Sequence, residues 1–112
     1  MGILEVFKGK GREIKDVEGN VYKVIFLFSS FKKANIEFNS FLEKMQRLEK
    51  EQNISDLEEI IKLGLIFYHK DFIDKLEKEG ISLLDIFDIE EVFNPIQEAL
   101  NDFFIKMNKK QV

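Results

Sequence analysis

Few residues in this sequence have the types and spacing that catalysis requires. His69 is the only histidine, and there is no cysteine. One chain therefore cannot build a Cys–His nucleophile or a pair of zinc-ligating histidines. A single histidine at the end of a predicted helix is typical of a cap or of a partly buried polar side chain. We expect a structural role for His69.

Two pairs of carboxylates have the i, i+3 spacing that would bring them together on a helix for acid–base chemistry. These pairs are Asp71/Asp74 and Asp85/Asp88. However, 21 acidic residues in a helical protein produce such pairs by chance, and acidic residues of this kind usually lie on a solvated face. The sequence therefore predicts no catalytic residues, no cofactor and no metal site, and we expect that the protein is not an enzyme.

The stretch Gly9–Arg12 combines two glycines with two basic residues, as some phosphate-binding loops do. It lacks the Walker spacing, and no Ser or Thr follows its lysine. Lys8, Lys10, Arg12 and Lys15 could form a small basic patch, but the net charge is −4. Without interleaved aromatic residues or a recognition helix, this patch does not indicate nucleic-acid binding.

The composition is that of one globular domain. The chain has 112 residues, of which 45% are hydrophobic and 34% charged, so it can bury a core. No apolar run approaches the roughly 20 residues of a membrane span, and the N-terminus lacks the apolar segment of a signal peptide. These features predict a soluble protein. The absence of cysteine does not fix the compartment, although it fits a reducing cytoplasm. Twelve phenylalanines are many for this length, and part of them could lie on a partner surface.

The beginning of the chain has the patterns of β structure. Glu13–Val17 and Val21–Phe28 are short apolar-rich runs on either side of a Glu-Gly-Asn turn, which predicts a hairpin. Residues 1–12 precede the hairpin and form either a flexible arm or an edge strand over Ile3–Phe7.

From Ser30, the predicted N-cap, the apolar spacing becomes helical. A stripe with 3,4,3,4,3 spacing of this length and aromatic content is typical of a helix that faces the core. Packing of the same stripe on another subunit or on a helical partner is the alternative. The stripe consists of Phe31, Ala34, Phe38, Phe41, Met45 and Leu48.

A buried central helix follows. Ser55 and Glu58 predict a capping box at its start, and its apolar residues nearly surround it. A short separate helix is predicted over Asp71–Glu79, and Gly80 is the expected left-handed C-terminal cap.

Ser82 starts a further helical turn, and Asp88 starts the last helical stretch. Pro95 interrupts that stretch and predicts either a kink or, as we favour, a fresh start with Asn94 as N-cap. Together the elements predict an α+β fold, mainly α, with an N-terminal β-hairpin packed on a small bundle of four to five helices. We expect residues 1–112 to form a single domain.

The order of elements carries a resemblance. A Gly-x-x-Tyr-x-Val-x-Phe strand over Gly19–Phe26 leads into an aromatic-rich helix. The apolar helix Leu57–His69 follows, and then come the helix starts at Ser82 and Asp88 and an amphipathic C-terminal helix. This pattern resembles the tail assembly chaperones of long-tailed bacteriophages and prophages of low-GC bacteria, over roughly Asp16–Met107.

The resemblance implies a non-catalytic tail assembly chaperone in the cytoplasm of the bacterial host. Such chaperones bind the tape measure protein, keep it soluble and help to recruit tail tube protein around it. They tend to self-associate, so a homo-oligomer is expected, without nucleic-acid or membrane partners. Two alternatives remain: another small phage-encoded binding protein, such as an inhibitor of a host enzyme, and a structural tail completion or connector subunit.

The expected partner surface is a groove of Phe and Met side chains that captures the apolar stripe of a helical partner. Ile105 is apolar and lies on the opposite side of the last helix from Phe103. Apolar side chains on two faces indicate that this helix is covered on more than one face. The residues expected to contact the partner are Phe31, Phe38, Phe41, Met45, Phe103, Phe104 and Met107.

Overall fold

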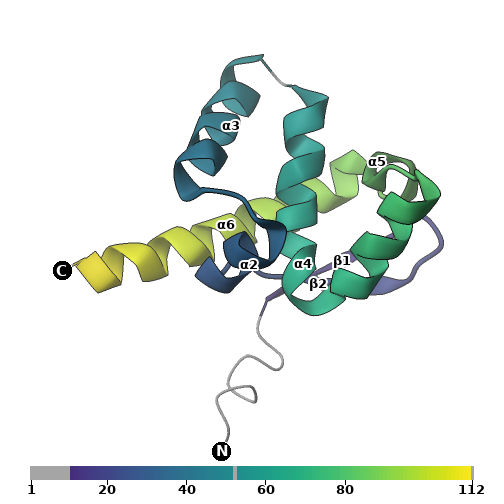
Figure 1. The fold of residues 1–112 in the computed structure, drawn as a ribbon, viewed down its shortest axis with the longest axis horizontal. Coiled ribbons are helices and arrows are strands. Elements are labelled where there is room, and N and C mark those ends of the chain that lie inside the picture. Colours follow the sequence, from purple (N-terminus) through teal and green to yellow (C-terminus); the bar gives the residue numbers. More distant parts are fainter. Residues whose placement is uncertain (1–10, 52, 112) are drawn as a thin grey trace, which may run out of the picture.

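The computed structural model describes residues 11–51 and 53–111, with side chains described as far as Met107. Within these ranges the chain forms one antiparallel hairpin followed by five helices (Figure 1), which confirms the predicted α+β, mainly α fold. The elements are β1 (Arg12–Lys15), β2 (Val21–Val24), α2 (Phe28–Ala34), α3 (Phe38–Glu51), α4 (Ile54–Glu79), α5 (Leu83–Ile86) and α6 (Ile89–Gln111). The arm or edge strand expected over Ile3–Phe7 lies outside the described residues.

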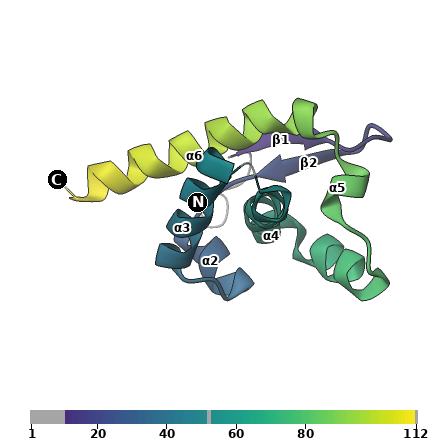
Figure 2. The same cartoon turned by 90° about the horizontal axis from the view of Figure 1, so that it is seen from above.

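The hairpin lies between two helices. β1 packs against α6 and β2 packs against α4 (Figure 2), and α4 and α6 also contact each other directly. In the antiparallel ladder Arg12 lies opposite Val24, and Lys15 lies opposite Val21. The buried apolar residues of the hairpin and the helices form one continuous cluster.

The buried side chain of Asp16 organises the hairpin turn. Its carboxylate accepts hydrogen bonds from the backbone N–H groups of Glu18 and Asn20 at 2.9 Å, and from the Asn20 amide and the Tyr22 hydroxyl at 3.0 Å. Burial by itself would raise the pKa of Asp16, but these hydrogen bonds outweigh it and hold the pKa below its ordinary value. The turn residues predicted the hairpin, but they did not predict the hydrogen bonds of the Asp16 carboxylate.

The second strand is shorter than predicted. It ends at Val24, because the next N–H group, that of Ile25, donates to the carbonyl of Gly64 in α4 at 2.9 Å and leaves the ladder. Phe28 therefore begins α2. The predicted N-cap was also wrong: Leu27 is the N-cap, and Ser30 lies inside the first turn, where its Oγ accepts the Leu27 N–H at 3.2 Å.

The single helix predicted through the Phe31–Leu48 stripe is wrong, because the stripe is divided between α2 and α3. Asn35 ends α2 with φ of 55°, in the left-handed region that asparagine tolerates better than most residues. The 3,4,3,4,3 spacing continues across this break, so the periodicity alone could not reveal it.

The central helix α4 is buried as predicted, but its ends differ. Asn53 is the N-cap, and its Oδ1 accepts the N–H groups of Ser55 and Asp56. Ser55 is therefore not the cap, and the Glu58 carboxylate instead accepts the Leu83 N–H at 2.8 Å. The helix predicted separately over Asp71–Glu79 is the second half of α4, beyond a kink at His69.

The predicted boundaries at Gly80, Ser82 and Asp88 are confirmed. Gly80 ends α4 with φ of 70°, and the Ser82 side chain caps α5. Asp88 accepts the Glu90 N–H at 3.0 Å at the start of α6. The preferred fresh start at Pro95 is wrong, because α6 continues through it. Proline has no N–H for the Glu91 carbonyl, so core packing of Val92, Ile96, Ala99 and Phe103 must hold this helix together.

Gly64 allows α4 to approach β2 closely. A Cβ at this position would lie 2.5 Å from Val24 Cγ1 and 3.0 Å from Phe26 Cζ. We expect Gly64→Ala to lower the free energy of unfolding by about 1–2 kcal/mol, since overpacking costs roughly 1–3 kcal/mol and alanine returns up to about 1 kcal/mol of helix propensity.

Urea unfolding of a double-mutant cycle with Val24→Ala tests this clash. Val24→Ala should cost less in the Gly64→Ala background than in the wild type, because it removes the Cγ1 atom that the new methyl group meets. Strictly additive effects would show that the two positions do not clash.

His69 joins the kink of α4 to the outer edge of β2. Its backbone is non-helical, with φ of −126° and ψ of 40°. Nε2 accepts the Lys23 N–H at 3.0 Å, and the Tyr22 ring packs edge-on at 5.3 Å. An Nε2 that accepts a hydrogen bond carries no proton, and burial lowers the pKa of His69. The residue has the structural contact expected from sequence.

This contact predicts a dependence of stability on pH. Unfolded His69 binds a proton near its ordinary pKa of 6.5, whereas folded His69 resists protonation. The contribution of His69 to the free energy of unfolding should be complete above pH 6.5. It should be lost as the pH falls through the pKa of His69 in the folded protein. We expect wild type to lose more stability than His69→Gln between about pH 7 and about pH 5 in urea titrations. Equal losses would contradict this role.

Candidate protein-binding site

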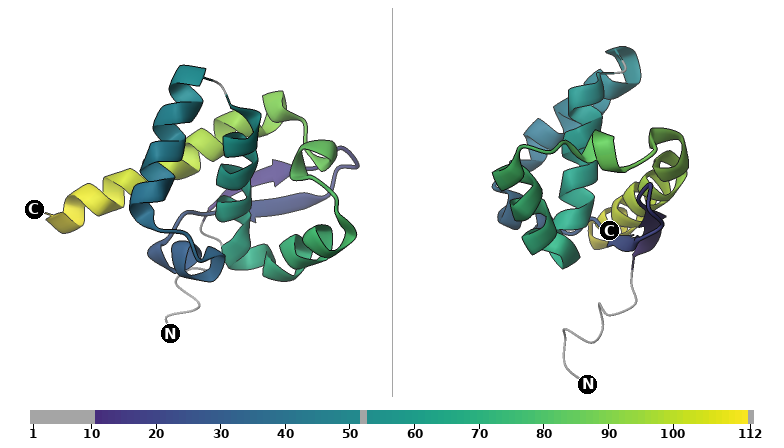
Figure 3. Two further views of the ribbon diagram at one scale, coloured as in Figure 1. Left: turned by 45° about the horizontal axis from the view of Figure 1, so that its top comes forward. Right: turned by 90° about the vertical axis from the view of Figure 1, so that its right-hand side faces the viewer.

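An apolar groove lies where α3, the first part of α4 and α6 meet. Its volume is about 480 Å³. Figures 1 and 3 show α3 and the first half of α4 beside each other, with α6 crossing behind both. We call this surface the α3–α6 groove. Its lining residues are Met45, Leu48, Glu49, Ile54, Leu57, Ile60, Ile89, Phe93, Ile96, Gln97 and Leu100.

Large apolar side chains at this groove are accessible to solvent. Ile54 is 58% exposed at the start of α4, and Phe93 is 48% exposed on α6. Met45, Leu48 and Leu100 are half-buried between them. Side chains of this size lose apolar contact with water when a partner covers them, which stabilises a complex.

Ion pairs hold α3 against α4 and so shape one wall of the groove. The Arg47 guanidinium donates two hydrogen bonds to the Asp56 carboxylate, at 2.8 and 2.7 Å. Lys44 also pairs with Glu59. The Asp56 side chain is only 5% exposed, and the hydrogen bond from Arg47 holds the pKa of its carboxyl below the ordinary value.

The other wall, α6, is positioned by the hairpin. Arg12 at the start of β1 donates to the two oxygens of Asp102 at 3.0 and 3.2 Å, and it also pairs with Glu98 at 3.1 Å. Val92, Ile96 and Ala99 pack into the core on the inner side of the helix. Ile89 and Phe93 are thereby left beside α3 and α4 at the groove.

The structure places three of the seven predicted contact residues inside the protein. Phe31, Phe41 and Phe103 are buried, so a partner cannot contact them in this conformation, and their assignment to the partner surface is corrected. They belong to an aromatic cluster whose ring centroids lie 5.1 to 6.4 Å apart, consisting of Phe26, Phe31, Phe38, Phe41 and Phe103. Because α2 and α3, on either side of the break at Asn35, both pack against α4, their stripe faces inward.

The remaining predicted residues lie at or near the surface. Met45 lines the groove. Phe38, Phe104 and Met107 are half-buried against the core. Phe104 and Met107 follow Leu100 by four and seven residues, and thus continue the groove side of α6 towards its C-terminal end.

Two exposed groove residues, Ile54 and Phe93, were missed by sequence reasoning. A signal for Phe93 exists, because Ile89, Phe93, Ile96 and Leu100 form a second helical stripe beside the buried one. Two adjacent apolar stripes on one helix indicate that a second surface needs cover. No comparable signal marks Ile54, because its place in the groove depends on α3 and α6.

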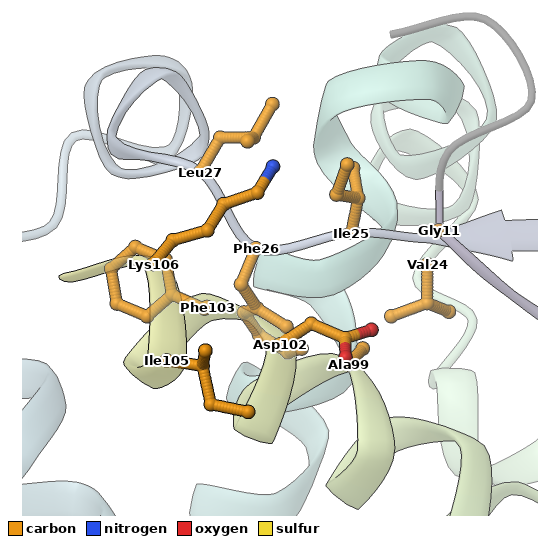
Figure 4. Close-up of a pocket in the computed structure, with 10 residues that line it drawn as sticks. All are labelled: Gly11, Val24, Ile25, Phe26, Leu27, Ala99, Asp102, Phe103, Ile105 and Lys106. Carbon is orange, nitrogen blue, oxygen red and sulfur yellow. The ribbon is translucent and has the colours of Figure 1, made fainter. Parts of the chain in front are cut away.

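A second hollow, of about 300 Å³, lies between the start of the hairpin and the later part of α6 (Figure 4). Ile25, Leu27 and Ile105 contribute apolar surface, and Lys106 lies at its edge. The Asp102 carboxylate beside it is already bound by Arg12. This second hollow is smaller than the α3–α6 groove.

Several of the residues first considered for chemistry have structural contacts. His69 accepts the Lys23 N–H, Asp74 pairs with Lys70, and Asp88 caps α6. Arg12 is engaged by α6, and Gly9 and Lys10 lie outside the described residues. Across residues 11–51 and 53–111, no group of three or more His, Asp or Glu side chains is arranged to hold a metal ion.

No family model, curated protein or solved structure matches this chain. Among the described helices, none has the length and apolar character to cross a membrane.

The Arg47–Asp56 pair predicts how the α3 wall responds to mutation and pH. Arg47→Ala leaves a buried carboxylate without its partner, so we expect lower stability and faster amide exchange in α3. Because the pKa of Asp56 is lowered in the folded protein, its carboxylate stabilises the fold at pH values above the ordinary pKa of 3.8. This stabilisation is lost as the pH falls through the pKa of Asp56 in the folded protein. The difference from wild type should therefore shrink in acid.

Lys50→Ala is the matched control, because Lys50 is an exposed basic residue in the last turn of the same helix. The amide exchange rates in α3 and the free energy of unfolding of this variant should be close to those of the wild type. Equal effects of the two variants would mean that the Arg47–Asp56 pair does not hold α3.

Proposed function

We propose that this protein is a non-catalytic binding domain that captures a helical segment of another protein in the α3–α6 groove. The observation that carries the proposal is the groove itself, an apolar concavity of about 480 Å³ formed by three helices. Phe93 and Ile54 lie exposed at it. Concave surfaces rimmed by exposed apolar side chains are typical of interaction sites.

The dimensions of the groove suit a helix. Its α6 wall runs from Ile89 to Leu100, which at 1.5 Å per residue is about 16 Å, or three helical turns. An amphipathic helix presents side chains at i, i+3, i+4 and i+7 to such a groove. Met45 can adapt its flexible side chain to different partner residues.

Within this class, we propose the role of a phage tail assembly chaperone in the cytoplasm of the bacterial host. Its partners would be the tape measure protein, which is long and helical, and the tail tube protein. The order of elements that resembles these chaperones supports this role, as do the dimensions of the groove, which suit a short helical segment. Self-association of several copies along one long partner would multiply weak contacts through avidity, so the proposal includes a homo-oligomer.

Replacement of Phe93 tests the groove. We expect Phe93→Gln to weaken binding of helical peptides tiled along the tape measure protein by at least about tenfold, because it removes a large apolar contact. Fluorescence anisotropy of labelled peptides measures the change. Phe93 is half-exposed, so the fold should tolerate the substitution, and circular dichroism verifies this.

Val17→Gln is the control, since Val17 is 67% exposed in the hairpin turn, away from the groove. It should bind as wild type does. If no peptide binds, or if Phe93→Gln binds with unchanged affinity, the groove does not perform the proposed function.

A further inference from the structure

Acidic residues lie at the α3–α6 groove and on its α6 wall. Glu49 is the single charged residue that lines it. From Ile89 to Ile105, α6 contains four acidic residues and no lysine or arginine. Two of them, Glu90 and Glu91, are exposed in its first turn, beside Ile89.

Most nearby basic side chains already form ion pairs with other carboxylates. Arg47 is bound to Asp56 and Lys44 to Glu59, both on the α4 side of α3. Arg12 compensates Glu98 and Asp102 on the hairpin side of α6. These pairs leave the negative charge of Glu49 and Glu90 next to the apolar lining.

We infer that the α3–α6 groove selects a basic amphipathic helix of another protein, one whose apolar stripe is flanked by lysine or arginine. The inference rests on the helix capture proposed above and adds the chemistry of the partner. The apolar stripe covers Phe93, Ile54 and Leu100, while flanking cations lie near Glu49 and Glu90. Complementary charge raises the association rate and disfavours acidic helices, because like charges would meet at the rim.

The test uses two designed probes and the full chain. Both are 14-residue capped peptides with the same leucine stripe, flanked in one by lysine and in the other by glutamate. We expect the lysine peptide to bind at least about tenfold more tightly at low salt, with a ratio that falls as salt rises. Fluorescence anisotropy measures both affinities.

Charge reversal locates the effect. The double variant Glu49→Lys/Glu90→Lys should lose the preference for the lysine peptide or invert it. The control Glu18→Lys/Glu79→Lys makes the same change in net charge at exposed sites in the hairpin turn and at the end of α4, and it should keep the preference. Retained preference in the groove variant would overturn the inference.

Other outcomes separate this inference from the proposed function. If both peptides bind equally and Phe93→Gln abolishes both, helix capture stands and the charge selection is wrong. If neither peptide binds, both ideas fail. If sedimentation shows that the chain self-associates and that Lys106→Glu restores peptide binding, the basic end of α6 of a second copy occupies the groove, which overturns the choice of a different protein.

Discussion

The close contact between α4 and β2 at Gly64 is the constraint on which most of the structure depends. The absence of a side chain there lets Val24 and Phe26 lie directly against the helix. It also brings the Gly64 carbonyl to the N–H of Ile25, which draws the chain out of the hairpin ladder. The early end of β2 and the close packing of this strand on α4 follow from this approach.

This arrangement accounts for part of the unusual phenylalanine content without a partner surface. Once β2 lies on α4, Phe26 faces the region where α2, α3 and α6 converge. Phe31, Phe41 and Phe103 fill that region with tilted and edge-to-face ring contacts. Such pairs add to the stabilisation from area burial. The aromatic residues therefore stabilise the core of this small domain.

The candidate binding surface arises from what this core leaves uncovered. Buried α6 residues fix one face of the helix, and the pair of Arg47 with Asp56 fixes α3 on α4. Between these anchored walls, Phe93 and Ile54 have no core to enter and remain half-exposed or more. The same pair holds the Arg47 guanidinium on Asp56, on the α4 side of α3.

Local patterns in the sequence determined the fold class, the hairpin, the buried central helix and the stops and starts at Gly80, Ser82 and Asp88, because turn chemistry, caps and periodicity act within a few residues. Only the tertiary structure decided the break at Asn35, the continuity of α6 through Pro95, the contact of His69 with β2 and the burial of Phe31, Phe41 and Phe103. These features depend on segments far apart in the chain, whose packing energies exceed local preferences of about 1 kcal/mol per residue. For the same reason the groove, which needs three helices at once, could not be read from any one of them.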